Sequence, residues 1–383
     1  MQRFYFDHNA TTPVAPEVFD TMAECLGQVY GNASSIHYFG QMAKRRLEAA
    51  RRQVARLIHA HPSEIVFTGG GTEADNLAIL GTARLAGTPG HIITTAIEHP
   101  AVLSACQALE REGFEVTCVP VNSGGIVDPE DVRRALRPST KLISVMHANN
   151  ELGTLQPVAE ISAMAREAGV PLHLDGVQAV GRVPVDVNEL GVDLYSMSGH
   201  KIYAPKGVGA LYVRKGRRLA PIVFGGHHER DRRPGTENVP AIAAFGRAAE
   251  LAGDRLATEG ERLAALRNRL EAAVLARLEG AGVNGARDRR VPNTSNVYFD
   301  FVDGEAMVIA LDLRGFAVST GSACSSGALT PSHVLTAIGL SADRARSSLR
   351  FSLGHDNTEE QVDALVDALE ASVAHLRRIS VHA

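Results

Sequence analysis

The chain has 383 residues, of which 45% are hydrophobic and 21% are charged, and its formal net charge is −4. This balance is typical of a folded protein with a large core and excludes an intrinsically disordered chain. A charge so close to zero gives the chain no electrostatic reason to bind nucleic acid or an anionic membrane, which favours a small-molecule substrate.

The N-terminal residues 1–8 lack the sustained apolar stretch of a signal peptide, and no later segment approaches the length of a membrane span. We therefore expect a cytoplasmic protein. The cysteines Cys25, Cys106, Cys118 and Cys324 form no CxxC pair, which argues against a disulfide framework and a structural zinc site. The first three lie in apolar helix or strand patterns, so we expect them to be buried packing residues.

Apolar residues recur at helical spacing between Leu47 and Ile58, which predicts an amphipathic helix that packs on a sheet. From residue 63 to residue 213, short β-branched runs alternate with helical patterns, as is typical of a mainly parallel sheet flanked by helices. Strands are expected at 64–68, 91–95, 114–120, 142–147, 171–175, 193–197 and 209–213. Helices are expected at 73–85, 101–112, 129–136 and 158–168.

Residues 241–278 are rich in Ala, Leu, Arg and Glu and predict long helices that lead from one domain to the next. Strands near 294–301 and 317–319, helices after Glu305 and Pro331, and a final helix over 358–378 then predict a smaller α+β domain. The length of the chain also favours two domains. We expect a large domain over 14–258 and a small domain formed by 1–13 and 259–383.

Polar residues follow several of the expected strand ends. They are Gly69–Gly71, His99, Asn149, Asp175 and Ser198–Lys201. In open sheets of this kind, ligands bind beyond the carboxyl ends of the strands. We therefore expect these residues to converge on one pocket.

Lys201 and Asp175 together suggest pyridoxal phosphate (PLP) chemistry. A PLP enzyme needs one amine that holds the cofactor as a Schiff base and one carboxylate that keeps the pyridine nitrogen protonated. Taken alone, the pair is equally compatible with a surface lysine and an ordinary aspartate at a strand end.

Residues 67–73 join an expected strand to an expected helix through three glycines. Such a turn presents backbone N–H groups and the hydroxyl of Thr72 to an anion, which suits the cofactor phosphate. Its spacing is neither GxGxxG nor that of a Walker loop, which argues against a dinucleotide or a nucleoside triphosphate. The alternative is a glycine-rich connection without a ligand.

Four further residues are candidates for the same site, each with a plainer alternative. His99 can stack on a flat ring and titrates near neutrality, or it is only a helix cap. Gln178 is placed to reach a ring substituent, or it is a solvated loop amide. Arg350 lies in an apolar strand, where it meets either a substrate carboxylate or an internal acid. Cys324 lies among small residues, where its sulfur is a candidate nucleophile that reaches both a substrate and a second protein.

Eight short motifs occur in order along the chain. They are DHNATTP at 7–13, GTEADN at 71–76, EH at 98–99, NNE at 149–151, DGVQ at 175–178, SGHK at 198–201, RPGT at 233–236 and GSAC at 321–324. With these motifs the chain resembles the cysteine desulfurases of the NifS/IscS type, within the class V aminotransferase family, from residue 4 to about residue 353. One departure is Gly176, where many relatives carry alanine.

The resemblance implies a PLP-dependent transferase of fold type I. It implies a homodimer that converts L-cysteine to L-alanine and passes the sulfur, through a persulfide on Cys324, to an acceptor such as an iron–sulfur scaffold protein. For the cofactor it implies Lys201 as the Schiff-base lysine, Asp175 at the pyridine nitrogen, His99 over the ring, Gln178 at the ring oxygen, and Gly71, Thr72, Ser198 and His200 at the phosphate, with Thr236 reaching the phosphate of the neighbouring subunit. For the substrate carboxylate it implies Asn149 and Arg350, with Asn32 a weaker candidate.

Three other functions compete with this one. A lyase that releases selenium or sulfur would use PLP without needing Cys324. A non-catalytic sulfur-relay or scaffold protein would have no use for Lys201, Asp175, His99 and Cys324 together. A dinucleotide-dependent oxidoreductase is disfavoured by the spacing of the glycine turn.

Overall fold

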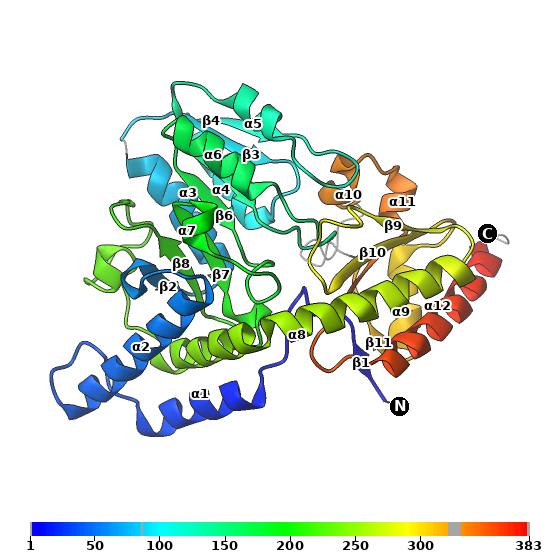
Figure 1. The fold of residues 1–383 in the computed structure, drawn as a ribbon, viewed down its shortest axis with the longest axis horizontal. Coiled ribbons are helices and arrows are strands. Elements are labelled where there is room, and N and C mark those ends of the chain that lie inside the picture. Colours follow the sequence, from blue (N-terminus) through cyan, green and yellow to red (C-terminus); the bar gives the residue numbers. More distant parts are fainter. Residues whose placement is uncertain (1, 86, 321–330, 381–383) are drawn as a thin grey trace.

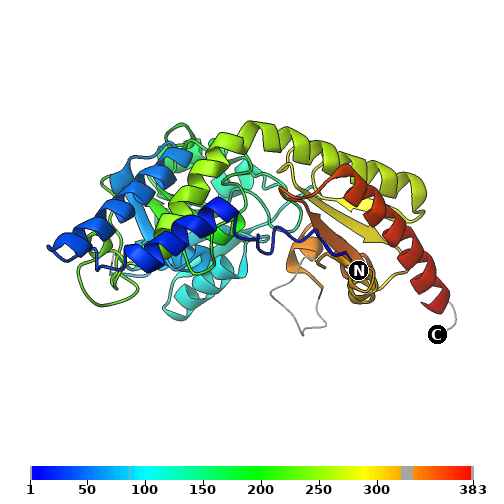
Figure 2. The same cartoon turned by 90° about the horizontal axis from the view of Figure 1, so that it is seen from below.

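A computed structural model describes residues 2–85, 87–320 and 331–380 of the chain. The described residues form two parts that one long helix joins, with the N-terminal strand in the same part as the C-terminal helix (Figure 1). In the view of Figure 2 this helix runs from one part to the other, and the N-terminal segment crosses between the two parts.

The larger part is built on a sheet with the strand order β2-β8-β7-β6-β5-β3-β4. Its strands are β2 (Ile65–Thr68), β3 (His91–Thr95), β4 (Glu115–Val119), β5 (Thr140–Met146), β6 (Leu172–Asp175), β7 (Leu194–Ser198) and β8 (Gly209–Val213). Strand β8 pairs antiparallel with both of its neighbours, and the other pairings are parallel. The prediction of a mainly parallel sheet is confirmed. The carboxyl ends of β3, β5, β6 and β7 therefore lie at one edge of the sheet. This arrangement is the one needed for the polar residues after these strands to converge on one pocket.

Helices cover both faces of this sheet. They are α1 (Pro16–Gln28), α2 (Tyr38–Leu57), α3 (Gly71–Leu85), α4 (Pro100–Arg111), α5 (Pro129–Ala135), α6 (Val158–Glu167) and α7 (Val187–Leu190), with the 3₁₀ turns η1 (Pro62–Glu64), η2 (Gly199–Lys201) and η3 (Glu229–Asp231). Helices α3 and α4 bury Leu77 and Val102 with Ile92 of the sheet in one apolar cluster. A second cluster unites Leu47 of α2 with Ile93 and residues of α6 and α8.

The smaller part contains two further sheets, with the orders β12-β10-β9 and β1-β11. Its elements are β1 (Phe4–Tyr5), β9 (Ala281–Asn284), β10 (Thr294–Phe299), α9 (Gly304–Asp312), β11 (Phe316–Ala317), α10 (His333–Ala337), α11 (Ala342–Arg346), β12 (Ser348–Ser352) and α12 (Glu359–Ser380). Phe6, Phe299, Phe351 and Leu369 belong to the core of this part. The N-terminus thus packs with segments more than 290 residues away in the sequence.

Helix α8 (Val239–Arg277) joins the two parts. The sequence predicted long helices over 241–278, and the structure has one continuous helix of 39 residues, about 60 Å long at 1.5 Å per residue. The helix continues through Gly246, where α8 packs closely on α2: a Cβ atom there would lie 2.5 Å from Ala50 Cα. The first third of α8 packs in the larger core and residues from Leu263 onwards in the smaller one. The domain boundary at 258/259, which falls inside this helix, stays a prediction.

Other predicted elements lie within a few residues of the observed ones, and a few elements were not predicted. Strands β1 and β9 are short or weakly patterned and were missed, and helix α1 was missed although it has 13 residues and an amphipathic pattern. The prediction that Cys118 is a buried packing residue was wrong, because β4 is the edge strand and this side chain is exposed.

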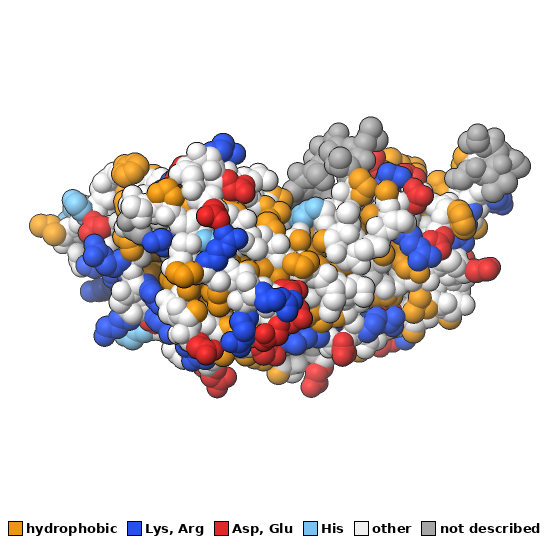
Figure 3. Space-filling view, turned by 90° about the horizontal axis from the view of Figure 1, so that it is seen from above, with side chains coloured by type: hydrophobic (Ala, Val, Ile, Leu, Met, Phe, Trp, Pro, Cys, Tyr) orange, Lys and Arg blue, Asp and Glu red, His pale blue; other side chains and the backbone are white. Residues whose placement is uncertain are grey.

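None of the helices in the described residues is both long and apolar enough to cross a membrane. Acidic and basic side chains are interspersed on the face shown in Figure 3.

Candidate active site

A cavity of about 440 Å³ lies where the carboxyl ends of the central strands face the smaller part. It is lined by Asn9, Ala10, Gly71, Thr72, Asp75, His99, Pro100, Met146, Ala148, Asn150, Glu151, Asp175, Val177, Gln178, Ser198, His200, Lys201, His333 and Arg350. The structure therefore brings together nine of the predicted site residues: Gly71, Thr72, His99, Asp175, Gln178, Ser198, His200, Lys201 and Arg350. Asn32, Asn149 and Thr236 do not line it, and Cys324 lies outside the described residues.

Lys201 ends the 3₁₀ turn that follows β7 and projects against the N-terminal segment. Its Nζ donates hydrogen bonds to the backbone oxygen of Asn9 at 2.5 Å and to that of Ala10 at 2.7 Å. Gln178 Nε2 donates to the same Asn9 oxygen at 3.0 Å. The lysine amine is thus fixed at the cavity wall beside the amide nitrogen of Gln178.

Asp175 is the last residue of β6 and is buried, with 6% of its surface exposed. One carboxyl oxygen accepts a hydrogen bond from Val177 N at 3.0 Å. Burial raises the pKa of this carboxyl above its ordinary value, against the opposing effect of His99 and Lys201. A buried carboxylate in this environment is stabilised by a ligand that brings a positively charged N–H group.

Asp75 is a second buried acid in the cavity wall, and the sequence analysis did not single it out. It lies one turn into α3, its Oδ1 is 3.6 Å from His173 Nε2, and its pKa is raised by burial and then by Asp175. Two neighbouring buried carboxyl groups disfavour ionisation of both, and the pKa of each lies above the ordinary range. The sequence feature that could have identified Asp75 is an acidic residue on the apolar face of an expected helix, four residues after Gly71 and between Ala74 and Leu77.

His99 has both of the roles that the sequence left open. It lines the cavity, and it also caps α4, because its Nδ1 accepts a hydrogen bond from Ala101 N at 3.1 Å. The proton of the neutral ring must then be on Nε2. Burial lowers the pKa of His99, which favours this neutral form.

The turn between β2 and α3 forms one end of the cavity and continues into a groove of about 680 Å³. Thr72, Ser198, His200 and Lys206 line this groove. A Cβ atom at Gly71 would lie 2.8 Å from Val177 Cγ2, so the close approach requires glycine. The hydroxyl of Ser198 is buried and has no hydrogen-bond partner within the described residues. A helix N-terminus, a lysine and an unpaired hydroxyl together fit a phosphate group.

His200 lies beside this end of the cavity and stays neutral. Its Nδ1 is 3.2 Å from Thr11 Oγ1, and burial lowers its pKa to about 4. It can therefore donate one N–H group to a phosphate oxygen without adding a charge.

Arg350 lies on β12 and is almost fully buried, at 2% exposure. Its Nη2 is 2.8 Å from Asp7 Oδ1, and its Nη1 donates to Asn150 O at 3.0 Å. The internal salt bridge that the sequence left open is therefore present. Because Arg350 also lines the cavity, the guanidinium is positioned to bind a substrate carboxylate while Asp7 keeps it in place.

The remaining predicted residues do not join the cavity. Asn149 is fully buried. Its side-chain nitrogen donates to Ile97 O at 3.0 Å, and its side-chain oxygen accepts from Glu151 N and Leu152 N. The side chain therefore holds the loop that carries Glu151. Asn32 and Thr236 are exposed away from the cavity. Their roles stay predictions.

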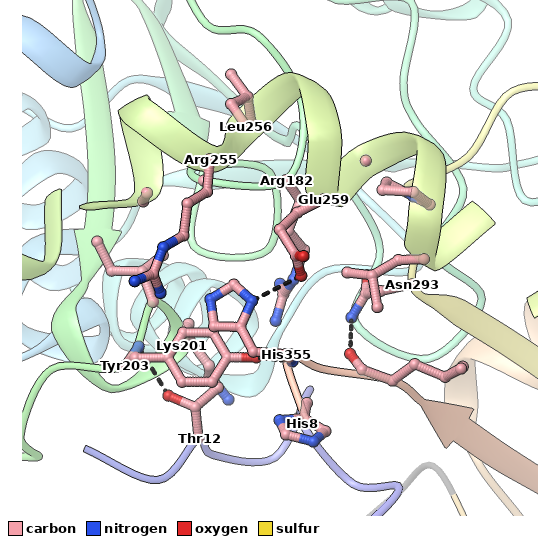
Figure 4. Close-up of a pocket in the computed structure, with 17 residues that line it drawn as sticks. His8, Thr12, Arg182, Lys201, Tyr203, Arg255, Leu256, Glu259, Asn293 and His355 are labelled. Carbon is pink, nitrogen blue, oxygen red and sulfur yellow. Dashed lines mark hydrogen bonds and ion pairs between the residues drawn. The ribbon is translucent and has the colours of Figure 1, made fainter. Parts of the chain in front are cut away.

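A second, small cavity of about 40 Å³ lies on the other side of Lys201 (Figure 4). His355 stacks on Tyr203 with 3.9 Å between ring centroids, and its Nδ1 is 2.7 Å from Glu259 Oε2. His8 also lines this cavity, and burial lowers its pKa to about 3. Residues from the N-terminus, β7–β8, α8 and the segment after β12 thus meet directly behind the lysine.

Gly176, where the sequence departs from many relatives, packs against Tyr195. A Cβ atom at this position would coincide with the edge of the buried Tyr195 ring. The hydroxyl of Tyr195 is 2.9 Å from His147 Nδ1, which fixes the ring in place beneath Asp175.

Comparison with known proteins gives concordant matches over nearly the whole chain. The class-V aminotransferase profile matches residues 4–365. A protein named cysteine desulfurase IscS from Dictyoglomus turgidum is 49% identical over 377 residues, which cover 98% of this chain and 96% of that protein. A cysteine desulfurase from Nostoc sp. is 46% identical over 380 residues, covering 99% and 95% of the two chains. The solved structure of a NifS-like protein matches with a TM-score of 0.92 at 36% identity, covering 98% of this chain and 100% of that one, which confirms the predicted fold.

Proposed function

This chain belongs to the class-V aminotransferase family, and we propose that it is a cysteine desulfurase that converts L-cysteine to L-alanine and retains the sulfur on Cys324. The observation that carries the proposal is the meeting of Lys201, Asp175 and His99 in one cavity whose far end is built for a phosphate. Relatives at 46% and 49% identity that are named cysteine desulfurases support the same reaction.

The residues present fit PLP as the cofactor. Lys201 would hold the aldehyde carbon, Asp175 the pyridine nitrogen, His99 the face of the ring, and the groove with Thr72, Ser198 and His200 the phosphate. The unpaired hydroxyl of Ser198 and the raised pKa of the Asp175 carboxyl are the observations that support this fit. When bound, PLP supplies an electron-withdrawing ring that makes bonds at the substrate carbon atoms easier to break.

The protein groups supply proton transfer and binding. Lys201 Nζ lies at the cavity wall, where its free amine would take the proton from the substrate Cα. His99 can donate its Nε2 proton and Arg350 can bind the carboxylate. The thiolate of Cys324 then attacks the substrate sulfur, the Cβ–Sγ bond breaks, and protonation of the carbon fragment at Cβ gives alanine.

We further propose a homodimer that is formed through the surface around α1 and the start of α2. This surface exposes several large apolar side chains: Phe19, Leu26, Tyr30, Ile36, Tyr38 and Phe39. Large apolar side chains that gather on one exposed surface often mark a protein–protein interface. Asn32 lies within it, and residues 33–34 line a groove with residues 227–230 and Glu237, next to Thr236. A second subunit placed there would explain why Asn32 and Thr236 face away from the cavity of their own subunit.

The acceptor of the sulfur is a further part of the proposal. A persulfide carries its outer sulfur in a form that a thiol of another protein can take, so a sulfur-acceptor or iron–sulfur scaffold protein is the expected partner. The cytoplasmic location expected from the sequence is retained as part of this proposal.

Mass spectrometry of the protein after incubation with PLP and L-cysteine tests the function. We expect free alanine together with a sulfur adduct of about +32 Da on the peptide that contains Cys324, as the balance of a persulfide requires. Alanine without an adduct would indicate a lyase, and neither product would exclude both PLP activities on cysteine.

Arg350→Ala is expected to raise the KM for L-cysteine by about tenfold to a hundredfold with the cofactor retained, because a charge-assisted hydrogen bond contributes about 1.5–3 kcal/mol. Steady-state kinetics measure this change. Asp7→Asn is the matched control, since it removes the ion-pair partner of Arg350 and leaves the guanidinium. Equal KM values for the two variants would mean that Arg350 acts only through its salt bridge.

A further inference from the structure

We propose that Arg182 is a positioning residue that fixes the orientation of the Gln178 amide, so that the amide nitrogen faces the ring oxygen of the cofactor. This inference rests on the proposed function, because it assigns a role toward PLP. Arg182 lies four residues after Gln178, behind the cavity wall, and lines the small cavity shown in Figure 4.

The hydrogen bonds of the Gln178 side chain determine where its oxygen and its nitrogen lie. Arg182 Nη1 donates to the backbone oxygen of Gln178 at 2.9 Å and also to its side-chain Oε1. A guanidinium has only donors, so a reversed amide would place two sets of N–H groups against each other. The oxygen of Gln178 must therefore face Arg182, and the nitrogen must face the opposite side.

The amide nitrogen of Gln178 lies on the side away from Arg182, next to Lys201. Gln178 Nε2 and Lys201 Nζ both donate to Asn9 O, at 3.0 Å and 2.5 Å, so the two nitrogens share one acceptor. In PLP the ring oxygen is bonded to the carbon next to the one that carries the aldehyde. A cofactor attached to Lys201 therefore has its ring oxygen near this amide nitrogen, whose second N–H group donates to no other residue in the described part of the chain.

The surroundings of Arg182 argue against a purely structural ion pair. Among the described residues it forms no ion pair, and the nearby Glu259 is already engaged by Arg262 and His355. Burial lowers the pKa of Arg182 to about 10, so the side chain still carries its charge near neutrality. A partly buried arginine without a carboxylate partner is costly, and its hydrogen bonds here go to Gln178.

The test is a spectrophotometric pH titration of the protein with bound PLP, followed through the visible band of the lysine-bound cofactor. An N–H donor to the ring oxygen stabilises its negative charge most when the neighbouring nitrogen is unprotonated, and it therefore lowers the apparent pKa of that nitrogen. We expect Arg182→Met to raise this apparent pKa by about one unit with PLP retained. Arg182→Lys is expected to restore it, because a single nitrogen makes both contacts.

Two comparisons make the result specific. Arg255→Met is the matched control: Arg255 lines the same small cavity, pairs with Glu17 at 3.2 Å and is expected to titrate as the wild type. In a Gln178→Leu background, Arg182→Met is expected to add no further shift. An unchanged titration in Arg182→Met, or an equal further shift in the double variant, would overturn the inference.

Two further outcomes are distinguishable from these. If Arg182→Met does not fold, Arg182→Ala, which also removes every side-chain N–H donor, gives the same comparison with the wild type. If the wild-type protein gains no visible band with PLP, the proposed function fails before Arg182 is tested.

Discussion

Lys201→Ala is expected to abolish the visible band that PLP forms with the protein and to lower desulfurase activity by about a thousandfold or more. The amine is the group that both holds the cofactor and moves the substrate proton, so its loss removes two functions at once. The variant should stay folded, because the hydrogen bonds that the lysine amine donates to Asn9 O and Ala10 O lie at the cavity wall, outside the apolar clusters of both parts. Absorbance spectroscopy after addition of PLP and an assay of alanine measure the two effects.

Lys215→Ala is the control for this variant, since Lys215 is exposed on the turn after β8, away from the cavity. It should retain both the band and the activity. A normal visible band in Lys201→Ala would show that another amine holds the cofactor, and the assignment of the site would then be wrong.

Cys324→Ser is expected to eliminate the sulfur adduct and to lower alanine formation from L-cysteine by at least about a hundredfold, because a hydroxyl does not replace a thiolate as the nucleophile toward sulfur. The visible band of the bound cofactor should be unchanged, since the cofactor-binding residues are intact. Intact-mass analysis and the alanine assay measure the result.

Cys118→Ser provides the matched control, because Cys118 is the exposed cysteine of the described part of the chain and lies on β4 at the sheet edge. It should leave both the adduct and the rate unchanged. Undiminished alanine production in Cys324→Ser would contradict the persulfide mechanism and favour the lyase that the sequence left as an alternative.

Much of the larger part of the fold follows from local sequence patterns. Strands such as His91–Thr95 are short, buried and bounded by turns, so periodicity and β-branched residues locate them directly. Strand β9 has small residues and half-buried positions, and β1 has two residues, so neither produces a pattern. The close packing of α8 on α2 at Gly246 and Ala50 joins segments that are far apart in the sequence, and local sequence does not report it.

The site was predictable where a residue follows a strand end, as Asp175 and Lys201 do. It was not predictable where the role depends on a partner far away in the sequence. Arg350 was itself predicted, but the ion pair that holds it is with Asp7, 343 residues away, and only the structure shows that pair. Arg182 lies four residues after Gln178, and the direction of its side chain, which the sequence pattern does not give, decides the contact. Asp75 was visible as an acid on an apolar helix face, but only the packing of α3 on the sheet places it beside Asp175.

The pairing of Gly176 with Tyr195 limits how this lineage can diverge. The alanine that many relatives carry at the first position has no room while the phenol ring remains at the second. Evolution toward that residue must therefore reduce the aromatic side chain first, and the reverse order passes through a disrupted intermediate. Consensus engineering that edits one position at a time would meet the same obstacle here.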